Sequence, residues 1–273
     1  MPVDIDRISE IVAETAETEV RPRFRALAEG EVREKSAGEL VTVADEAAEA
    51  ALSRRLRDEL PGSVVLGEEA AANEPAVFDY LAGDDPVWVI DPVDGTGNFA
   101  RGVATFAVML ALVRRGETHA AWIHEPVAGR MTVASHGAGA WLDGERLRLP
   151  PPPKEAAAMR GTLHASGYGT PSLRRRLDKR RHLVDAVPSL RCAGAEYVRM
   201  ARGEQHFSIF TKLAPWDHAP GTLILTESGG VARLSDGRTY APQVDEAEAL
   251  LLAPNNASWD TLHRTLLAAD DHS

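Results

Sequence analysis

Apolar residues recur every three or four positions in two stretches near the start of the chain, which is the spacing of one face of a helix. The stretches are residues 6–28 and 44–60, and we expect a helix over each of them. A Pro-Gly pair follows the second stretch and should end it. A short apolar segment at 64–67 and a continuous apolar run at 87–90 predict two buried strands.

The middle of the chain changes to short apolar segments separated by turn-forming residues, which predicts an antiparallel meander. Asp143-Gly144 is a hairpin signal within the last of these segments. The prolines at 150–153 then form a cluster of the kind that separates domains. The predicted strands of the meander are 106–113, 119–125, 130–135 and 140–149.

Beyond the proline cluster, segments of strand length alternate with segments of helical spacing, which is typical of an α/β arrangement. We therefore predict an N-terminal α+β domain over residues 1–150, with the sequence DPVDGT, and a C-terminal α/β domain over 151–273, with the sequence WDHAPG. The elements expected in the second domain are strands at 161–166, 206–210 and 247–253, a hairpin at 231–240, helices at 171–186, 195–203 and 216–230, and a final helix.

Composition narrows the class of protein. The chain has 273 residues, of which 44% are hydrophobic and 26% charged, as in ordinary soluble globular proteins. No apolar run approaches the roughly 18 residues of a membrane span, and the acidic start of the chain is unlike a signal peptide. The single cysteine, Cys192, excludes an internal disulfide and suits a reducing compartment. We expect a cytoplasmic protein that does not enter a membrane and, with a net charge of −11, does not bind nucleic acid.

The sequence DPVDGT at residues 91–96 follows the apolar run that we predict to be a strand. Its two carboxylates, with a stiff proline between them, suit a hard divalent cation, which prefers oxygen ligands. The carbonyl of Val93 could join them, and the N–H groups of Gly95 and Thr96 could donate to phosphate oxygens. A solvated turn is the alternative, because these are also turn-forming residues. The buried strand before the motif favours a functional site.

Three other carboxylates could belong to the same functional site. Each of them also has an ordinary structural explanation as the alternative. Glu68 follows a strand-like segment and could reach the same cation, or lie on a solvated surface. Asp217 opens a predicted helix, where it could cap free N–H groups or face the DPVDGT turn across the boundary between the halves. Asp45 could cap the second helix, or hold the hydroxyl of Thr96 so that it takes a proton from an attacking water.

Together and in this order, these pieces resemble the inositol monophosphatase family. The family pattern is Gly-Glu-Glu, then Asp-Pro-[Ile/Leu/Val]-Asp-Gly-Thr-x-Asn-Phe, and much later Trp-Asp-x-Ala-x-Gly followed by Glu-[Ala/Ser]-Gly-Gly. The resemblance spans most of residues 35–254 and implies the layered αβαβα fold of that family. The matching segments are residues 67–69, 91–99, 137–147, 216–221 and 227–230.

The resemblance implies a role for each motif residue. Asp45 and Thr96 match the pair that activates the attacking water, Glu68 is the third implied catalytic residue, and Lys35 matches a lysine near a mobile active-site segment. The implied cofactor is Mg²⁺, with two ions and room for a third, weaker one. The implied metal ligands are Glu68, Asp91, the Val93 carbonyl, Asp94 and Asp217. The implied substrate-binding residues are Gly95, Thr96, Cys192, Ala193 and Phe210.

The chain departs from the family pattern around the alcohol part of the substrate. Phe210 stands where inositol-type members have a glutamate for the sugar hydroxyls. Residues 166–169 stand where they have Gly-Ser-Ser-Arg, and residues 191–193, Arg-Cys-Ala, stand where they have Gly-[Ser/Thr]-Ala. We therefore expect modest activity on inositol 1-phosphate, and better activity on an ester whose leaving group has an apolar or aromatic face.

The resemblance thus implies a Mg²⁺-dependent phosphomonoesterase that acts on small soluble phosphate esters and forms a homodimer. Inositol monophosphate is the default substrate. The alternatives are another sugar or nucleotide phosphate, such as fructose 1,6-bisphosphate, histidinol phosphate or phosphoadenosine phosphate. A non-catalytic regulatory partner in transcription or RNA processing is a hypothesis of a different class. The basic helix at 171–185 is a solvated face by the simplest interpretation, and a binding site for a second substrate phosphate by the other.

Overall fold

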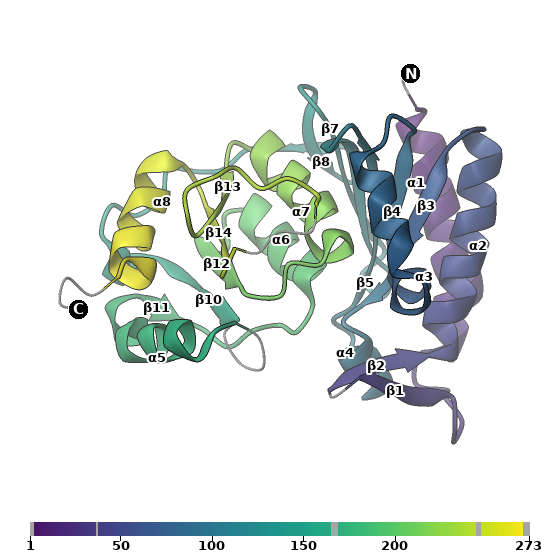
Figure 1. Ribbon diagram of the computed structural model, residues 1–273, viewed down its shortest axis with the longest axis horizontal. Helices are drawn as coiled ribbons and strands as arrows, with labels where there is room; N and C mark the ends of the chain where they lie inside the picture. Colours follow the sequence, from purple (N-terminus) through teal and green to yellow (C-terminus); the bar gives the residue numbers. More distant parts are fainter. Residues whose placement is uncertain (1–2, 37, 165–168, 244–246, 270–273) are drawn as a thin grey trace.

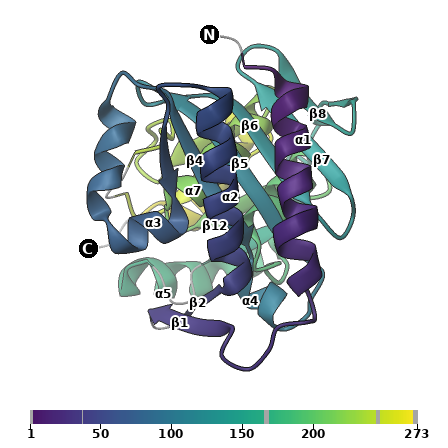
Figure 2. The same ribbon diagram turned by 90° about the vertical axis from the view of Figure 1, so that its right-hand side faces the viewer.

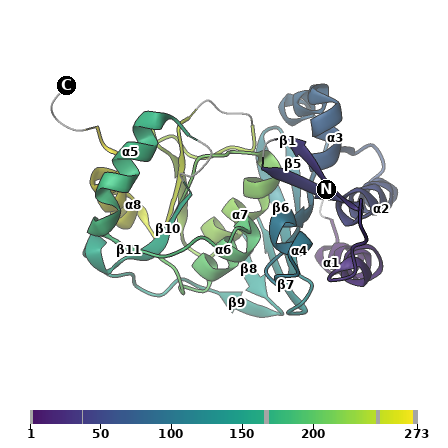
Figure 3. The same cartoon turned by 90° about the horizontal axis from the view of Figure 1, so that it is seen from below.

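The computed structural model describes residues 3–36, 38–164, 169–243 and 247–269, in which helices and sheets alternate in five layers (Figure 1 and Figure 3). The layered αβαβα fold predicted from the sequence is therefore confirmed. The outer helical layer on one side contains α1 (Ile5–Thr15), α2 (Val43–Glu59) and α3 (Glu68–Asn73). The middle helical layer contains α6 (Ala193–Ala201) and α7 (Pro215–Glu227), and the other outer layer contains α5 (Pro171–Arg180) and α8 (Asn256–Leu262).

The larger sheet is the meander expected for the first half of the chain. Its order is β3-β4-β5-β6-β7-β8-β9, and β3 runs parallel to β4 while the remaining pairs are antiparallel. The turn between β8 and β9 has positive φ at Asp143 (49°) and Gly144 (83°), as the Asp-Gly hairpin signal predicts. The strands are β3 (Val64–Gly67), β4 (Val87–Asp94), β5 (Ala107–Arg114), β6 (Glu117–Glu125), β7 (Arg130–Ser135), β8 (Gly139–Leu142) and β9 (Glu145–Leu147).

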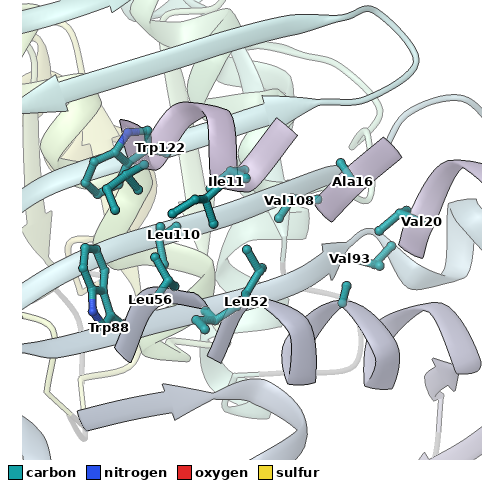
Figure 4. Close-up of a cluster of buried hydrophobic side chains, with 14 of the residues drawn as sticks. Ile11, Ala16, Val20, Leu52, Leu56, Trp88, Val93, Val108, Leu110 and Trp122 are labelled. Carbon is teal, nitrogen blue, oxygen red and sulfur yellow. The ribbon is translucent and has the colours of Figure 1, made fainter. Parts of the chain in front are cut away.

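Helices α1 and α2 lie side by side on one face of this sheet (Figure 2). Their apolar faces, with Ile11, Leu52 and Leu56, pack against Trp88 and Trp122 of the sheet (Figure 4). Burying each large apolar side chain contributes about 1.5–3 kcal/mol to folding. This core therefore holds β4 firmly, and β4 is the strand that carries the DPVDGT motif.

The smaller sheet has the order β11-β10-β12-β14-β13. Strand β10 is parallel to β11 and β12, whereas β14 is antiparallel to both of its neighbours. Helices α6 and α7 lie between the two sheets, and α7 contacts strands of the larger sheet as well as β13. The strands are β10 (Arg160–His164), β11 (Asp185–Ala186), β12 (Phe207–Phe210), β13 (Val231–Leu234) and β14 (Leu250–Ala253).

Two of the predicted helices end earlier than their hydrophobic spacing indicated. The first changes to a wider helical turn at Ala16–Val20 and to a tighter one at Arg21–Arg23, after which the chain makes a turn with positive φ at Arg25. The helix predicted over 171–186 ends at Arg180, because Asp185–Ala186 pairs with β10 at the edge of the smaller sheet. Long-range pairing of this kind leaves no periodic signal in the local sequence.

A short hairpin and a short helix beside the DPVDGT motif were not predicted. Strands β1 (Val32–Ser36) and β2 (Glu39–Thr42) form an antiparallel hairpin that leads into α2. Helix α4 (Thr96–Ala100) follows β4 directly, and β2 lies against it. Both elements therefore border the end of β4. None of the helices in the described parts of the chain is both long enough and apolar enough to cross a bilayer.

Candidate active site

The end of β4 carries two of the predicted metal ligands. Asp91 and Asp94 are both buried, and the pairing of β4 with β5 is irregular between them. The N–H of Val93 donates to the Asp91 carboxylate at 3.1 Å. The chain then turns at Gly95, whose φ of +87° favours glycine. A Cβ at this position would lie 3.2 Å from two backbone carbonyls and one side chain of neighbouring segments, so the turn requires glycine.

Asp94 also binds the start of α6. Its carboxylate accepts hydrogen bonds from the N–H groups of Ala193 (3.0 Å) and Gly194 (2.6 Å) and from the thiol of Cys192 (3.0 Å). Burial, together with the charge of Asp217, raises the pKa of Asp94 to about 7, although these three donors oppose the shift. Cys192 and Ala193, which we expected to bind substrate, thus contact Asp94 and also line the cavity described below.

Asp217 completes a cluster of three carboxylates. It lies in the first turn of α7, but the N-cap of this helix is Ala214 and no side chain caps it, so the capping alternative for Asp217 is wrong. One oxygen each of Asp91, Asp94 and Asp217 lies within 4.8 Å of the others. Burial and the neighbouring carboxylates raise the pKa of Asp91 well above its usual range, and burial raises the pKa of Asp217. Anionic groups this close and this buried are stable together when a cation joins them.

Glu68 reaches the same cavity from the neighbouring strand. Since β3 and β4 are parallel, both end at one edge of the sheet, and Glu68 begins α3 on the cavity wall that Asp91 also lines. Its carboxylate accepts a hydrogen bond from Lys35 Nζ at 2.8 Å, and Lys35 also contacts Glu69 at 2.7 Å. Burial raises the pKa of Glu68, and Lys35 opposes this shift. The alternative of a solvated surface for Glu68 is therefore wrong.

Asp45 and Thr96, the pair expected to activate water, are in contact. Thr96 Oγ1 lies 3.0 Å from Asp45 Oδ1 and 3.0 Å from the carbonyl of Val93. The alternative in which Asp45 is the N-cap of α2 is wrong. Thr42 is the N-cap, and its N–H and hydroxyl donate to Asp45 Oδ2 at 2.9 and 2.5 Å. Burial raises the pKa of Asp45 to about 7, which suits proton exchange near neutral pH.

Glu49 is absent from the predicted site but holds Glu68 in place. It lies one helical turn after Asp45 on α2, and its carboxylate accepts hydrogen bonds at 2.8 and 2.9 Å from the N–H groups of the two residues after Glu68. Gly67 allows this approach, because a Cβ there would lie 2.3 Å from the carboxyl carbon of Glu49. The spacing of two acids four residues apart on one helix face was the signal in the sequence that could have indicated Glu49.

A cavity of about 660 Å³ extends from the carboxylates toward the second sheet. Phe210 lies on its wall but is only 6% exposed, because its ring stacks on His164 and Tyr197, with centroid distances of 4.4 and 5.8 Å. The ring therefore offers little surface to a ligand, and His164 supplies more of this wall. Of the departing segment 166–169, residues 166–168 lie outside the described residues.

His164 is held by a buried carboxylate that the sequence patterns did not single out. Glu196 accepts a hydrogen bond from His164 Nε2 at 2.6 Å, and the hydroxyl of Ser189 bridges the two residues at 3.2 and 3.1 Å. Thr162 and Ser208 also donate to Glu196. Burial acts to raise the pKa of Glu196, but the hydrogen bonds from these donors, of which that of His164 has the largest effect, lower it. The signal in the sequence that could have indicated Glu196 was an acidic residue on the apolar face of a predicted helix.

The donor set at the carboxylates fits Mg²⁺. Hard cations of this kind prefer carboxylate and carbonyl oxygens, which are the groups gathered here. The one thiol nearby, that of Cys192, is a poor ligand because burial raises its pKa well above the usual value. The residues that could hold such an ion are Glu68, Asp91, Val93 through its carbonyl, Asp94 and Asp217.

Comparison with known proteins identifies the family of the chain. A model of the inositol monophosphatase family matches residues 3–271. The chain belongs to the inositol monophosphatase family. It is accordingly a phosphomonoesterase, and Mg²⁺ dependence is a general trait of the inositol monophosphatase family.

Members of the inositol monophosphatase family with different names resemble this chain. It is 35% identical over 210 residues to the Nus factor SuhB of Pseudomonas aeruginosa, covering 73% of this chain and 74% of that protein. It is 30% identical over 210 residues to the fructose-1,6-bisphosphatase/inositol-1-monophosphatase of Thermotoga maritima, covering 75% and 76%. The solved structure of the extragenic suppressor protein suhB from Bartonella henselae has the same fold, with a TM-score of 0.81 at 22% identity over 97% of this chain and 99% of that chain.

Proposed function

We propose that this chain is a Mg²⁺-dependent phosphatase that hydrolyses small soluble phosphate monoesters. The observation that carries the proposal is the cluster of Asp91, Asp94 and Asp217, whose oxygens lie within 4.8 Å of one another and which line a cavity of about 660 Å³. A cation site next to a cavity of this size can take a phosphate group and leave room for the alcohol.

The residues that would hold Mg²⁺ are those carried over from the family pattern, namely Glu68, Asp91, the Val93 carbonyl, Asp94 and Asp217. When bound, the cation supplies positive charge against the phosphate and increases the acidity of water. The N–H groups of Gly95 and Thr96, at the turn into α4, are proposed to donate to the phosphate oxygens.

Thr96 and Asp45 are proposed to manage the proton of the attacking water. Thr96 Oγ1 can accept a hydrogen bond from water while it donates its own hydrogen to Asp45 Oδ1, 3.0 Å away. As the water oxygen bonds to phosphorus, its proton passes to Thr96 and the threonine proton passes to Asp45. The pKa of Asp45, which burial raises to about 7, makes it an effective base near neutral pH. The leaving alkoxide takes a proton from solvent.

The substrate is proposed to be inositol monophosphate or a related sugar or nucleotide phosphate, including fructose 1,6-bisphosphate, histidinol phosphate and phosphoadenosine phosphate. The departure at Phe210 counts against inositol monophosphate as the preferred substrate, because a buried aromatic ring cannot pair with the ring hydroxyls as a glutamate does. We further expect a homodimer in the cytoplasm, and sedimentation of the purified chain tests the oligomeric state.

A second candidate function is that of a regulatory partner in transcription or RNA processing. Its support is the name of the Pseudomonas aeruginosa relative, Nus factor SuhB, at 35% identity. A catalytically inactive Asp91→Asn variant separates the two functions. If the chain acts as a partner, this variant still binds a purified transcription complex; if it acts solely as an enzyme, neither the variant nor the wild type binds.

Release of phosphate from p-nitrophenyl phosphate tests the leading proposal. We expect hydrolysis in millimolar Mg²⁺, none in chelator, and none by Asp91→Asn, because that change removes a central carboxylate of the cluster. Asp84→Asn is the matched control, since Asp84 is an exposed acid that pairs with Arg115 and does not line the cavity. Near-normal turnover by Asp91→Asn, or equal rates with and without Mg²⁺, would refute the metal assignment.

A further inference from the structure

Two arginines line the cavity that holds the carboxylate cluster. Arg181 and Arg191 line the same 660 Å³ cavity as Asp91 and Asp94. A smaller cavity of about 260 Å³ continues from it past Arg181 and is also lined by Arg174. The chain as a whole is acidic, with a net charge of −11. The lining of the cavity nevertheless combines carboxylates with arginines.

Arg191 occupies a backbone conformation that arginine rarely adopts. Its φ is +55°, in the left-handed region, and it stands where the family resemblance has glycine. The backbone is held there by the Ser189 hydroxyl, which accepts the Arg191 N–H at 2.9 Å, and by the close approach of Gly95 to the Arg191 carbonyl. Glycine would satisfy these contacts without strain. A residue that keeps a strained backbone conformation beside a cavity is a candidate for a function of its side chain.

Other basic groups at the cavity are already engaged. Arg101 donates to the Asn98 side chain at 3.2 Å, and Lys212 pairs with Glu39. Within the described residues, the side chains of Arg191 and Arg181 form no ion pair. Two positive charges in the cavity lining are therefore available to a ligand.

Helix α5 is oriented so that part of its basic surface faces the cavities. Arg176 and Arg180 donate to the carbonyls of Leu267 and Ala268, which anchors the helix on the side of the C-terminal turn. Arg174 and Arg181 line the smaller cavity instead, together with one acid, Asp178. The two arginines outnumber this carboxylate, so the smaller cavity carries a net positive charge.

We propose that the alcohol part of the substrate carries a second anionic group, a phosphate or a carboxylate, which Arg191 and Arg181 bind while the first phosphate lies at the carboxylate cluster. This inference rests on the proposed phosphatase function and specifies its substrate class. Guanidinium groups bind both anions through paired hydrogen bonds, so the two arginines select for charge on the alcohol part of the ester. Neither residue acts on the phosphoester bond; both determine specificity.

Pairs of esters that differ by one anionic group test the proposal. Glucose 1,6-bisphosphate is compared with glucose 1-phosphate, and 2-phosphoglycerate with glycerol 2-phosphate, as kcat/KM at constant ionic strength. We expect the wild type to prefer the doubly anionic member by about 10- to 100-fold, the range for a hydrogen bond to a charged group. The first pair reports on a second phosphate and the second pair on a carboxylate.

Variants assign this preference to the arginines. Arg191→Gly relieves backbone strain and Arg181→Gln keeps a polar side chain, so neither threatens the fold. Each should abolish most of the preference through KM and leave p-nitrophenyl phosphate hydrolysis within about twofold, because neither arginine belongs to the hydrolytic machinery. Arg175→Gln is the matched control, an exposed arginine of α5 that lines neither cavity, and should keep the preference.

The results distinguish this inference from the proposed function. If p-nitrophenyl phosphate is hydrolysed but both pairs react equally, or if Arg191→Gly and Arg181→Gln leave the preference intact, the inference is overturned and the phosphatase stands. If the aryl ester is not hydrolysed, the proposed function fails. The esters of both pairs then stay intact in solution, and calorimetry compares their affinities for the chain. Equal affinity for the members with one and with two anionic groups overturns the inference as well.

Discussion

At the scale of single residues, the hydroxyl of Thr96 is shared between a carboxylate and a carbonyl. Its oxygen lies 3.0 Å from Asp45 Oδ1 and 3.0 Å from the carbonyl of Val93. A hydroxyl can donate one hydrogen and can accept hydrogen bonds through two lone pairs. Thr96 therefore donates its hydrogen to one of these two acceptors, and its oxygen can still accept a hydrogen bond from water. Thr96 is thus a relay between the cavity and Asp45.

Truncation of Thr96 tests the relay. Thr96→Ala should lower kcat by about 10²–10⁴, the usual effect of losing a positioned proton-transfer group. Thr96→Ser keeps the hydroxyl and should retain much of the activity. Rates of p-nitrophenyl phosphate hydrolysis at saturating Mg²⁺ give both values. Equal damage from the two changes would mean that the methyl group, and hence packing, is what matters.

At the scale of elements, the site depends on how α2 and α3 meet. Glu49 of α2 accepts the first free N–H groups of α3, which a helix start otherwise leaves without partners. This contact fixes where Glu68 enters the cavity. Burial raises the pKa of Glu49 from 4.5 to about 7, although the two N–H groups oppose the shift. The contact therefore has a predictable dependence on pH.

The sign of that dependence follows from linkage. The folded chain binds the Glu49 proton more tightly than the unfolded chain, so this stabilising contribution is full below about pH 4.5 and is lost as pH rises through about 7. Gln at this position cannot ionise. The melting temperature of Glu49→Gln relative to wild type should therefore rise between pH 5 and about pH 8, measured by calorimetry in chelator.

The control for this experiment is Asp58→Asn, an exposed acid on the same helix, whose difference from wild type should stay constant with pH. If the Glu49→Gln difference is equally flat, then Glu49 is ionised throughout the range and its raised pKa is wrong. A fall in the difference with rising pH would reverse the sign and count equally against it.

At the scale of the whole molecule, the two halves of the chain share one cluster of negative charge. Asp91 and Asp94 come from the larger sheet and Asp217 from a helix of the C-terminal half. Their mutual repulsion opposes the packing of α7 against that sheet, and a divalent cation converts the repulsion into attraction. Metal binding and the stability of the folded chain are therefore coupled.

We expect Mg²⁺ to raise the melting temperature. At an ion concentration of about 100 times the dissociation constant, binding to the native state adds about 2.7 kcal/mol, which for a chain of this size corresponds to roughly 5–10 °C. A thermal scan in chelator against Mg²⁺, with NaCl matched for ionic strength, measures the shift. Asp91→Asn should reduce it. Equal melting temperatures with and without Mg²⁺ in the wild type would contradict the coupling.

The local sequence by itself determined most elements and the chemistry at the end of β4. Residues 44–60 and the meander strands follow from periodicity, because helix and strand spacing is a local property. The DPVDGT motif predicted paired carboxylates from the preference of hard cations for oxygen, and they are buried together as expected. The order of motifs along the chain was enough to indicate the family, which the family comparison confirms.

The tertiary structure decided everything that depends on partners distant in sequence. The contact of Glu49 with the start of α3 exists because β3 lies parallel to β4, and the burial of Phe210 exists because His164 and Tyr197 stack on it. The presence of Arg181 and Arg191 in one cavity depends on the tertiary structure as well, because the two residues come from different segments. Such contacts arise from sheet order and layer packing, which combine distant segments, and no window of neighbouring residues contains that information.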